Sequence, residues 1–284
     1  MLHLIIGGAG CGKSTRLIGQ IRKAYEQGEQ IYALVPEQYS FTNDLKLYEA
    51  LGPTAFNAIQ SLSFTSLARA LFQQYGGRSG EYADDLTKTI LLYQSIRALS
   101  DSSAFSHFDR QAKKPAFQDA AAKAITELRR GSISPEALLE QTARLEGRLR
   151  DKAADLAVLY GDYDRQLREK GYKDSLTDIT EAAALCAGNE HFKGALLFLD
   201  EFESFTGDQM EFLDVLFAQA KELWITLRTE DPEAPAYSVF DATNATYRRL
   251  LALRQGSDAL RSGTFRLLLP EHPQLLAYER ACGE

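Results

Sequence analysis

The sequence predicts an α/β protein with a parallel sheet and a large all-helical insertion. Short apolar runs alternate with amphipathic helical patterns in residues 1–77, and the same alternation returns in residues 191–284. Such an alternation indicates a parallel sheet with right-handed crossovers. Residues 78–190 show helical periodicity without a convincing strand. We therefore expect one α/β domain made of residues 1–77 and 191–284, and a helical insertion made of residues 78–190.

Each predicted strand is a short apolar run that ends at a turn or polar residue. The first run ends at Gly7, and the second ends at Pro36, which cannot donate to a strand ladder. Lengths of five to seven residues are typical of strands. The predicted strands are Leu2–Ile6, Ile31–Val35, Phe56–Leu62, Ala195–Leu199, Leu223–Leu227 and Phe265–Leu269.

The predicted helices follow from apolar residues that recur every three to four positions. Ser134 and Pro135 form a typical helix start, with serine as the cap and proline at the first helical position. Tyr160 and Tyr163 lie at helical spacing among leucines, which favours a core role. Arg129 and Arg130 form a basic pair at the end of a predicted helix, where cations complement the helix dipole. The predicted helices are 13–25, 64–75, 86–99, 117–130, 134–145, 149–170, 209–220 and 243–253.

A glycine-rich loop lies between the first strand and the first helix. Its sequence, GGAGCGKS, fits the phosphate-binding pattern GxxxxGK[ST]. Glycines let the backbone curl and turn its N–H groups toward phosphate oxygens. Lys13 should reach the β and γ phosphates of ATP, and the Ser14 hydroxyl should bind Mg²⁺. A chance glycine turn is the alternative, and the strand-loop-helix context disfavours it. The predicted nucleotide-binding residues are Gly7, Gly8, Ala9, Gly10, Cys11, Gly12, Lys13, Ser14 and Thr15.

A pair of acidic residues follows the apolar run Ala195–Leu199. Asp200, at the carboxyl end of that strand, should hold Mg²⁺ through water. Glu201 is the candidate catalytic residue, because it could orient and deprotonate the attacking water. The alternative is that the two acids simply end a buried strand.

The tract DEFESFTGDQ, residues 200–209, resembles motif II of the UvrD-like superfamily 1 helicases, whose pattern is close to DEFQDTxxxQ. Residues 36–42 (PEQYSFT) stand where those helicases carry motif Ia. Residues 63–68 (SFTSLA) resemble their TFHSLA segment, which touches single-stranded DNA. The resemblance implies a RecA-like domain 1A with subdomain 1B as the helical insertion. For Phe64, base stacking and a core role both stay open. The DNA-binding residues implied are Gln38, Thr42, Ser63, Phe64 and Thr65.

The amino-acid sequences of several segments resemble those of a narrower family. LVPEQYSFTNDL, the SFTSLAR segment, residues 125–136 and residues 152–163 are similar to the amino-terminal part of AddB, which belongs to the bacterial AddAB ATP-dependent helicase/deoxyribonuclease. The resemblance implies ATP binding, a role in double-strand break resection and recombinational repair, an AddA-type helicase-nuclease partner, and single- and double-stranded DNA as ligands. These 284 residues carry no nuclease motif or iron–sulfur cysteine set, so we expect a fragment that does not cut DNA.

The sequence also departs from the helicase pattern. The γ-phosphate sensor GDxxQ is missing after Leu223–Leu227, where Arg228 to Asp231 stand instead. An adenine-reading glutamine segment before the loop and a second motor domain are also missing. Many AddB sequences carry glycine after the motif II aspartate, whereas this chain has Glu201. We therefore expect ATP binding by a degenerate motor and leave hydrolysis open. A stand-alone P-loop ATPase or small-molecule kinase, and a scaffold stabilised by nucleotide, are the alternatives.

Composition sets limits on the class of protein. The hydrophobic content of 45% and charged content of 25% fit a globular protein, and no apolar run approaches the ~20 residues of a membrane span. The chain starts with a strand and lacks a basic leader, so a cytoplasmic location is expected. Its net charge of −7 argues against a protein that coats nucleic acid with its whole surface. The three cysteines are scattered and form no metal-ligand spacing.

Overall fold

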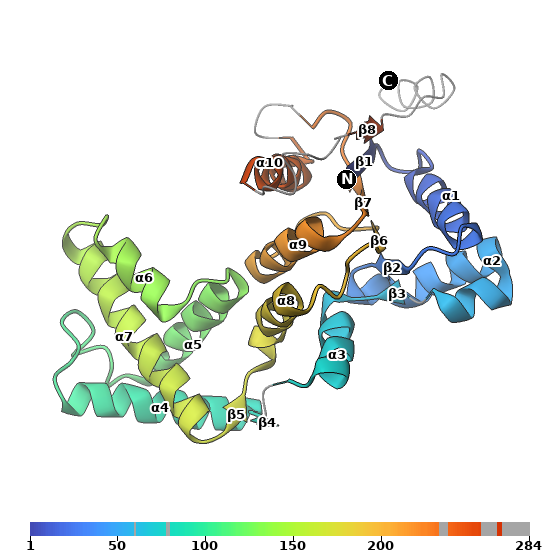
Figure 1. Cartoon of the computed structure of the whole chain (residues 1–284). Coiled ribbons are helices and arrows are strands. Elements are labelled where there is room, and N and C mark those ends of the chain that lie inside the picture. Colours follow the sequence, from blue (N-terminus) through green and yellow to red (C-terminus); the bar gives the residue numbers. More distant parts are fainter. Residues whose placement is uncertain (60, 78–79, 233–237, 257–265, 269–284) are drawn as a thin grey trace. The chain divides into compact units, whose positions relative to one another are not determined.

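The computed structural model describes residues 1–59, 61–77, 80–232, 238–256 and 266–268 (Figure 1). The chain forms two compact units. The sheet unit comprises Met1–Tyr75, Ala182–Phe205 and Gln209–Glu284, and the helical unit comprises Gly76–Glu181 with Thr206–Asp208. Residues 182–190 therefore group with the sheet unit, although their sequence pattern had placed them in the insertion. The assignment of these units to helicase subdomains 1A and 1B stays a prediction.

The sheet unit contains a six-stranded sheet in the order β3-β2-β6-β7-β1-β8, in which every pair of neighbours is parallel. The predicted parallel sheet is thus confirmed. Because all strands run the same way, the residues that follow β1, β6 and β7 lie at one edge of the sheet. Gly7 at the end of β1 pairs in register with Arg228 at the end of β7. The strands are β1 (Leu2–Gly7), β2 (Ile31–Leu34), β3 (Ser61–Leu62), β6 (Leu196–Leu199), β7 (Glu222–Arg228) and β8 (Arg266–Leu268).

Helices cover both faces of this sheet, as Figure 1 shows for α1 and α9. On one face, Leu17 and Ile21 of α1 and Leu47 of α2 pack with Phe198 and other buried strand residues. On the other face, Phe64 of α3 contacts Phe212 of α9. The helices are α1 (Lys13–Glu26), α2 (Ser40–Ala58), α3 (Phe64–Tyr75), α8 (Asp178–Asn189), α9 (Gly207–Gln219) and α10 (Asp241–Gly256), and a 3₁₀ turn, η1 (Glu37–Tyr39), precedes α2.

The predicted third strand is wrong over most of its length. Helix α2 continues through a bend at Gly52, whose φ is 80°, as far as Ala58. Phe56, which follows this bend, packs edge-on against Tyr48, which precedes it, with ring centroids 5.8 Å apart. Its apolar side chain is thus used in helix packing, and among the described residues of 56–62 only β3 joins the sheet. In the last predicted strand, Phe265 and Leu269 lie outside the described residues. The described residues of that prediction form β8.

The helical unit is built around a separate hydrophobic core that includes Leu91, Ile125, Leu159, Tyr160 and Tyr163. The predicted core role of the two tyrosines is confirmed, because both are buried. The two-residue strands β4 (Glu81–Tyr82) and β5 (Tyr172–Lys173) pair in parallel, although no strand was predicted here. The helices are α4 (Asp85–Asp101), α5 (Pro115–Arg130), α6 (Pro135–Thr142) and α7 (Gly147–Glu169), with a 3₁₀ turn, η2 (Ser175–Thr177), before α8.

Two helix ends of this unit test the capping predictions. Ser134 caps α6, since its hydroxyl accepts a hydrogen bond of 3.1 Å from the amide of Ala137. Arg129, expected to complement a helix dipole, is instead buried and pairs with Asp164 and Asp174. A buried guanidinium needs such partners because an uncompensated charge is costly to desolvate. Across the described part of the chain, no helix has both the length and the apolar character that a bilayer crossing requires.

Candidate functional site

The glycine-rich loop joins β1 to α1 and has the backbone that its glycines allow. Gly10 and Gly12 have φ angles of 72° and 82°, in the left-handed region that favours glycine. Helix α1 begins at Lys13 without a side-chain cap and without an acidic residue in its first turn. Its amino-terminal N–H groups and positive dipole end are therefore available to an anion.

Lys13 lies across its own loop. Its ammonium donates a hydrogen bond of 2.5 Å to the carbonyl oxygen of Gly8 and lies 3.8 Å from the sulfur of Cys11. The side chain is half-buried and lines a pocket of about 680 Å³. The cation thus stands at the loop, in the position that a phosphate-binding lysine needs.

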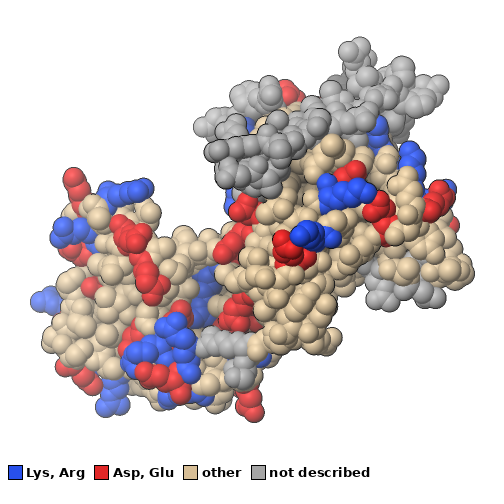
Figure 2. All heavy atoms as spheres, in the orientation of Figure 1, with Lys and Arg blue, Asp and Glu red and all other residues tan. Residues whose placement is uncertain are grey.

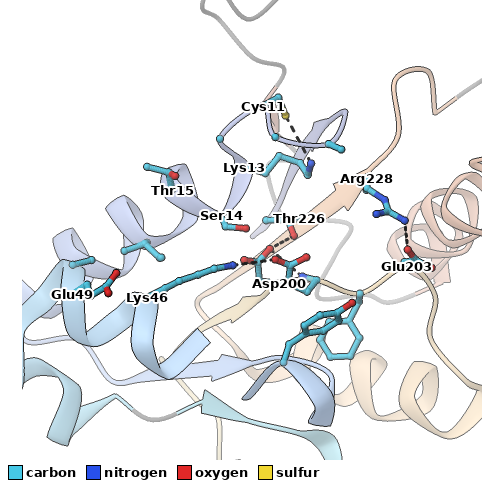
Figure 3. Close-up of a pocket in the computed structure, with 18 residues that line it drawn as sticks. Cys11, Lys13, Ser14, Thr15, Lys46, Glu49, Asp200, Glu203, Thr226 and Arg228 are labelled. Carbon is cyan, nitrogen blue, oxygen red and sulfur yellow. Dashed lines mark hydrogen bonds and ion pairs between the residues drawn. The ribbon is translucent and has the colours of Figure 1, made fainter. Parts of the chain in front are cut away.

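Asp200 follows β6 and enters the same pocket (Figure 3). The residue is only 4% exposed. Its Oδ1 accepts hydrogen bonds from the Thr226 hydroxyl on β7 and, at 3.0 Å, from the amide of Glu201. Its buried Oδ2 has no hydrogen-bond partner within the described structure. A buried carboxylate oxygen left without a donor fits a cation ligand, and the Ser14 hydroxyl lines the same pocket.

Glu201 has a strained backbone and a cationic neighbour. Its φ of 63° lies in the left-handed region, which is unfavourable for a residue with a side chain. Its Oε1 accepts a hydrogen bond of 3.2 Å from the ammonium of Lys46 on α2. The position therefore has a backbone that suits glycine, and the carboxylate forms an ion pair at the pocket rim.

The pocket brings together residues that are far apart in the sequence. It contains Ala9 to Thr15 of the predicted nucleotide-binding set and both motif II acids; Gly7 and Gly8 are buried at the end of β1 and are not part of its lining. Sequence reasoning missed Lys46, Thr226 and Arg228, which also line the pocket. The sequence did offer a signal for Thr226, because a threonine within the otherwise apolar run of β7 indicates a buried hydroxyl that needs a partner. No sequence signal pointed to Lys46.

A second hollow of about 450 Å³ lies next to this pocket, which we call the nucleotide pocket after its predicted ligand. Its lining includes Gln38, Ser63, Phe64 and Thr65 of the predicted DNA-binding set, whereas exposed Thr42 is not part of it. Four residues, Tyr39, Glu201, Phe202 and Glu203, line both hollows. We call the second hollow the strand-end groove. The structure thus brings four of the five predicted residues together beside the nucleotide pocket.

Phe64 and Ser63 have structural tasks within this groove. Phe64 is 2% exposed, and its ring lies 5.7 Å from that of Phe202 and 6.2 Å from that of Phe205. Ser63 begins α3, because its hydroxyl accepts a hydrogen bond of 3.1 Å from the amide of Ser66. The core role left open for Phe64 agrees with this packing, and base stacking would require its ring to leave the core.

Comparison with known proteins agrees with this arrangement. The family model described as ADDB, N-terminal matches residues 4–262. Three similar curated proteins are each named as the B subunit of an ATP-dependent helicase/deoxyribonuclease. The one from Clostridium perfringens strain SM101 is 30% identical over 89% of this chain and 22% of its own length. The one from Clostridium acetobutylicum is 29% identical over 90% and 22%, and the one from Clostridium botulinum strain Hall is 31% identical over 81% and 20%.

The matched region therefore spans about a fifth of the length of these relatives, 20–22%. The family match extends over most of the chain, from the β1 strand to beyond α10. It includes the glycine-rich loop, the acids after β6 and the strand-end groove. The chain belongs to the AddB amino-terminal family.

Proposed function

We propose that this chain is the ATP-binding, helicase-like amino-terminal module of a helicase-nuclease subunit that acts in double-strand break resection and recombinational DNA repair. One observation carries the nucleotide part of the proposal. The loop lysine and buried Asp200, whose Oδ2 is unpartnered, line one pocket from two different strand ends. A RecA-like fold for the sheet unit is part of the proposal, supported by the parallel sheet with the loop after β1 and the acid after β6.

The loop, Lys13, Ser14, Asp200 and Thr226 each have a task in the proposed complex. The loop amides and the amino-terminal end of α1 bind phosphate oxygens, and Lys13 neutralises the β and γ phosphates. The Ser14 hydroxyl and Asp200 hold Mg²⁺, which balances phosphate charge when bound. Thr226 donates to Oδ1 of Asp200 and so leaves Oδ2 for the metal or its water.

Glu201 is the candidate base for hydrolysis, and its surroundings favour slow turnover. A carboxylate that is ion-paired with an ammonium is turned toward that cation and is less available to orient a water. Lys46 supplies such an ammonium at 3.2 Å. Each side chain of this ion pair is 39% exposed. Solvent therefore screens the pair, and other partners can displace it. We therefore propose a module that binds ATP and turns it over slowly.

DNA contact is proposed for the strand-end groove and not for the surface as a whole. Figure 2 shows Lys and Arg side chains interspersed with Asp and Glu on the visible face. The net charge of −7 also opposes broad attraction to phosphate backbones. Exposed Gln38 and half-buried Thr65 offer polar contacts to a single strand at the groove, and exposed Thr42 on α2 stays a proposed contact outside the groove lining. The relatives' name supports an AddA-type partner as a further proposal.

Nucleotide titration tests the proposal directly. A fluorescent ATP analogue with Mg²⁺ should bind the wild-type chain, and Lys13→Ala should weaken binding by about tenfold or more, because it removes a charge-assisted contact to phosphate. Lys23→Ala, an exposed lysine of the same helix, is the matched control and should bind as the wild type does. Equal binding by wild type and Lys13→Ala, or none by the wild type, overturns the site.

Single-stranded DNA separates the proposal from its rivals. Hydrolysis measured with and without DNA should be slow and should rise when DNA is added. Nucleotide binding that raises thermal stability, with no DNA effect on turnover or affinity, would instead favour a scaffold. Phosphate transfer to a small molecule in the absence of DNA would favour a kinase.

A further inference from the structure

Arg228 is the last residue of β7 and stands beside the glycine-rich loop. It is in register with Gly7, where β1 passes into the loop. Its side chain lines the nucleotide pocket together with Lys13 (Figure 3). The sequence carries no GDxxQ phosphate sensor after this strand. The structure therefore supplies a cation at the same strand end, on the side of the loop opposite α2.

Arg228 forms an ion pair with Glu203, which follows β6. The two side chains are 53% and 61% exposed. Such an exposed pair contributes little to stability, because solvent screens the charges. A terminal phosphate carries more charge than a carboxylate and accepts two parallel hydrogen bonds from a guanidinium. The guanidinium can therefore exchange Glu203 for phosphate at a small energetic cost.

Helix α10 holds the backbone on both sides of this ion pair. The buried Thr229 hydroxyl, directly after Arg228, donates a hydrogen bond of 2.6 Å to the side-chain oxygen of Asn244. The Thr246 hydroxyl donates one of 3.1 Å to the carbonyl oxygen of Glu203. The backbone of Glu203 is thus bonded to α10, and that of Arg228 lies in the sheet directly before the anchored Thr229, so the two exposed side chains are the parts that can change partner.

We propose that Arg228 is a sensor of the terminal phosphate of a nucleoside triphosphate. This inference rests on the proposed nucleotide site. With diphosphate bound, or without nucleotide, Arg228 stays paired with Glu203. With triphosphate bound, its guanidinium turns to the terminal phosphate and releases Glu203. Because Glu203 also lines the strand-end groove, its released carboxylate changes the charge of that groove according to the nucleotide.

The ratio of ATP to ADP affinity tests this role. Titrations with fluorescent analogues of both nucleotides, in Mg²⁺, should give a wild-type preference for ATP. Arg228→Ala should lower ATP affinity by roughly tenfold and leave ADP affinity unchanged, because only ATP offers the terminal phosphate. Arg228→Lys should recover part of the preference. Glu203→Gln should raise ATP affinity, because the competing carboxylate charge is gone.

Arg69→Ala, an exposed arginine of α3 outside the nucleotide pocket, is the matched control and should keep the wild-type ratio. An unchanged ratio in Arg228→Ala, with nucleotide binding still lost in Lys13→Ala, overturns the sensor alone. Equal losses for ATP and ADP in Arg228→Ala also overturn it, since they indicate a structural role. A wild-type chain that binds neither nucleotide overturns the sensor and the proposed function together.

Discussion

Replacement of Asp200 by asparagine should stabilise the free protein and impair its response to Mg²⁺. The Asp200 carboxylate is buried, and its two hydrogen bonds both end on Oδ1. An unsatisfied buried polar group costs about 1–3 kcal/mol, and more when it is charged. Asparagine keeps an acceptor for the Thr226 hydroxyl and the Glu201 amide but leaves its own amide group unpaired. The net expected gain in the free energy of unfolding is therefore about 1 kcal/mol.

Urea denaturation followed by tryptophan fluorescence measures this change. Trp224 is the chain's single tryptophan and lies on β7, two residues before Thr226, so its emission reports on the sheet beside the site. Asp214→Asn, an exposed acid on α9, is the matched control and should shift the free energy of unfolding by less than about 0.5 kcal/mol.

The same titration repeated with ATP tests the metal-ligand role. A ligand that binds only the folded state stabilises it by about 2.7 kcal/mol at a concentration one hundred times its dissociation constant. The wild-type chain should gain more stability from ATP when Mg²⁺ is present, and Asp200→Asn should lose that metal-dependent part. A loss of about 1 kcal/mol or more in the free variant refutes the argument about unpaired Oδ2. An unchanged Mg²⁺ response refutes the role of Asp200 as a ligand.

Two further predictions concern groups outside the nucleotide pocket: buried Arg129 and half-buried His191. Arg129→Met should lower the stability of the helical unit by about 3 kcal/mol, because it leaves Asp164 and buried Asp174 without their guanidinium. Thermal unfolding followed by far-ultraviolet circular dichroism measures this change. A loss of stability below about 1 kcal/mol contradicts the prediction. Burial lowers the pKa of His191, so the stability that its neutral ring contributes is present above about pH 6.5 and is lost as the pH falls. His191→Gln should therefore lose less stability than the wild type between about pH 7 and pH 5. Equal losses of stability in His191→Gln and in the wild type over this pH range contradict this reasoning.

The sequence by itself determined the features that depend on neighbouring residues. The loop motif, its flanking strand and helix, and the capped start of α6 all involve contacts within a few residues. The same holds for most helices of the helical unit. Their apolar residues recur every three to four positions, and in a helix this spacing places them on one face, which can be buried. The resemblance to AddB was also readable from the sequence, because motif II, the SFTSLA segment and their order are linear features.

Only the tertiary structure determined which side chains meet at the carboxyl ends of the strands. Asp200 receives a hydrogen bond from Thr226 only because β6 and β7 are neighbours. Lys46 reaches Glu201, and Arg228 reaches Glu203, across 155 and 25 residues of sequence. For Phe64 the sequence left both base stacking and a core role open, and its contacts with Phe202 and Phe205 place it in the core. Local periodicity specifies an element and its buried face, whereas partners across the sheet depend on strand order, which no short segment encodes.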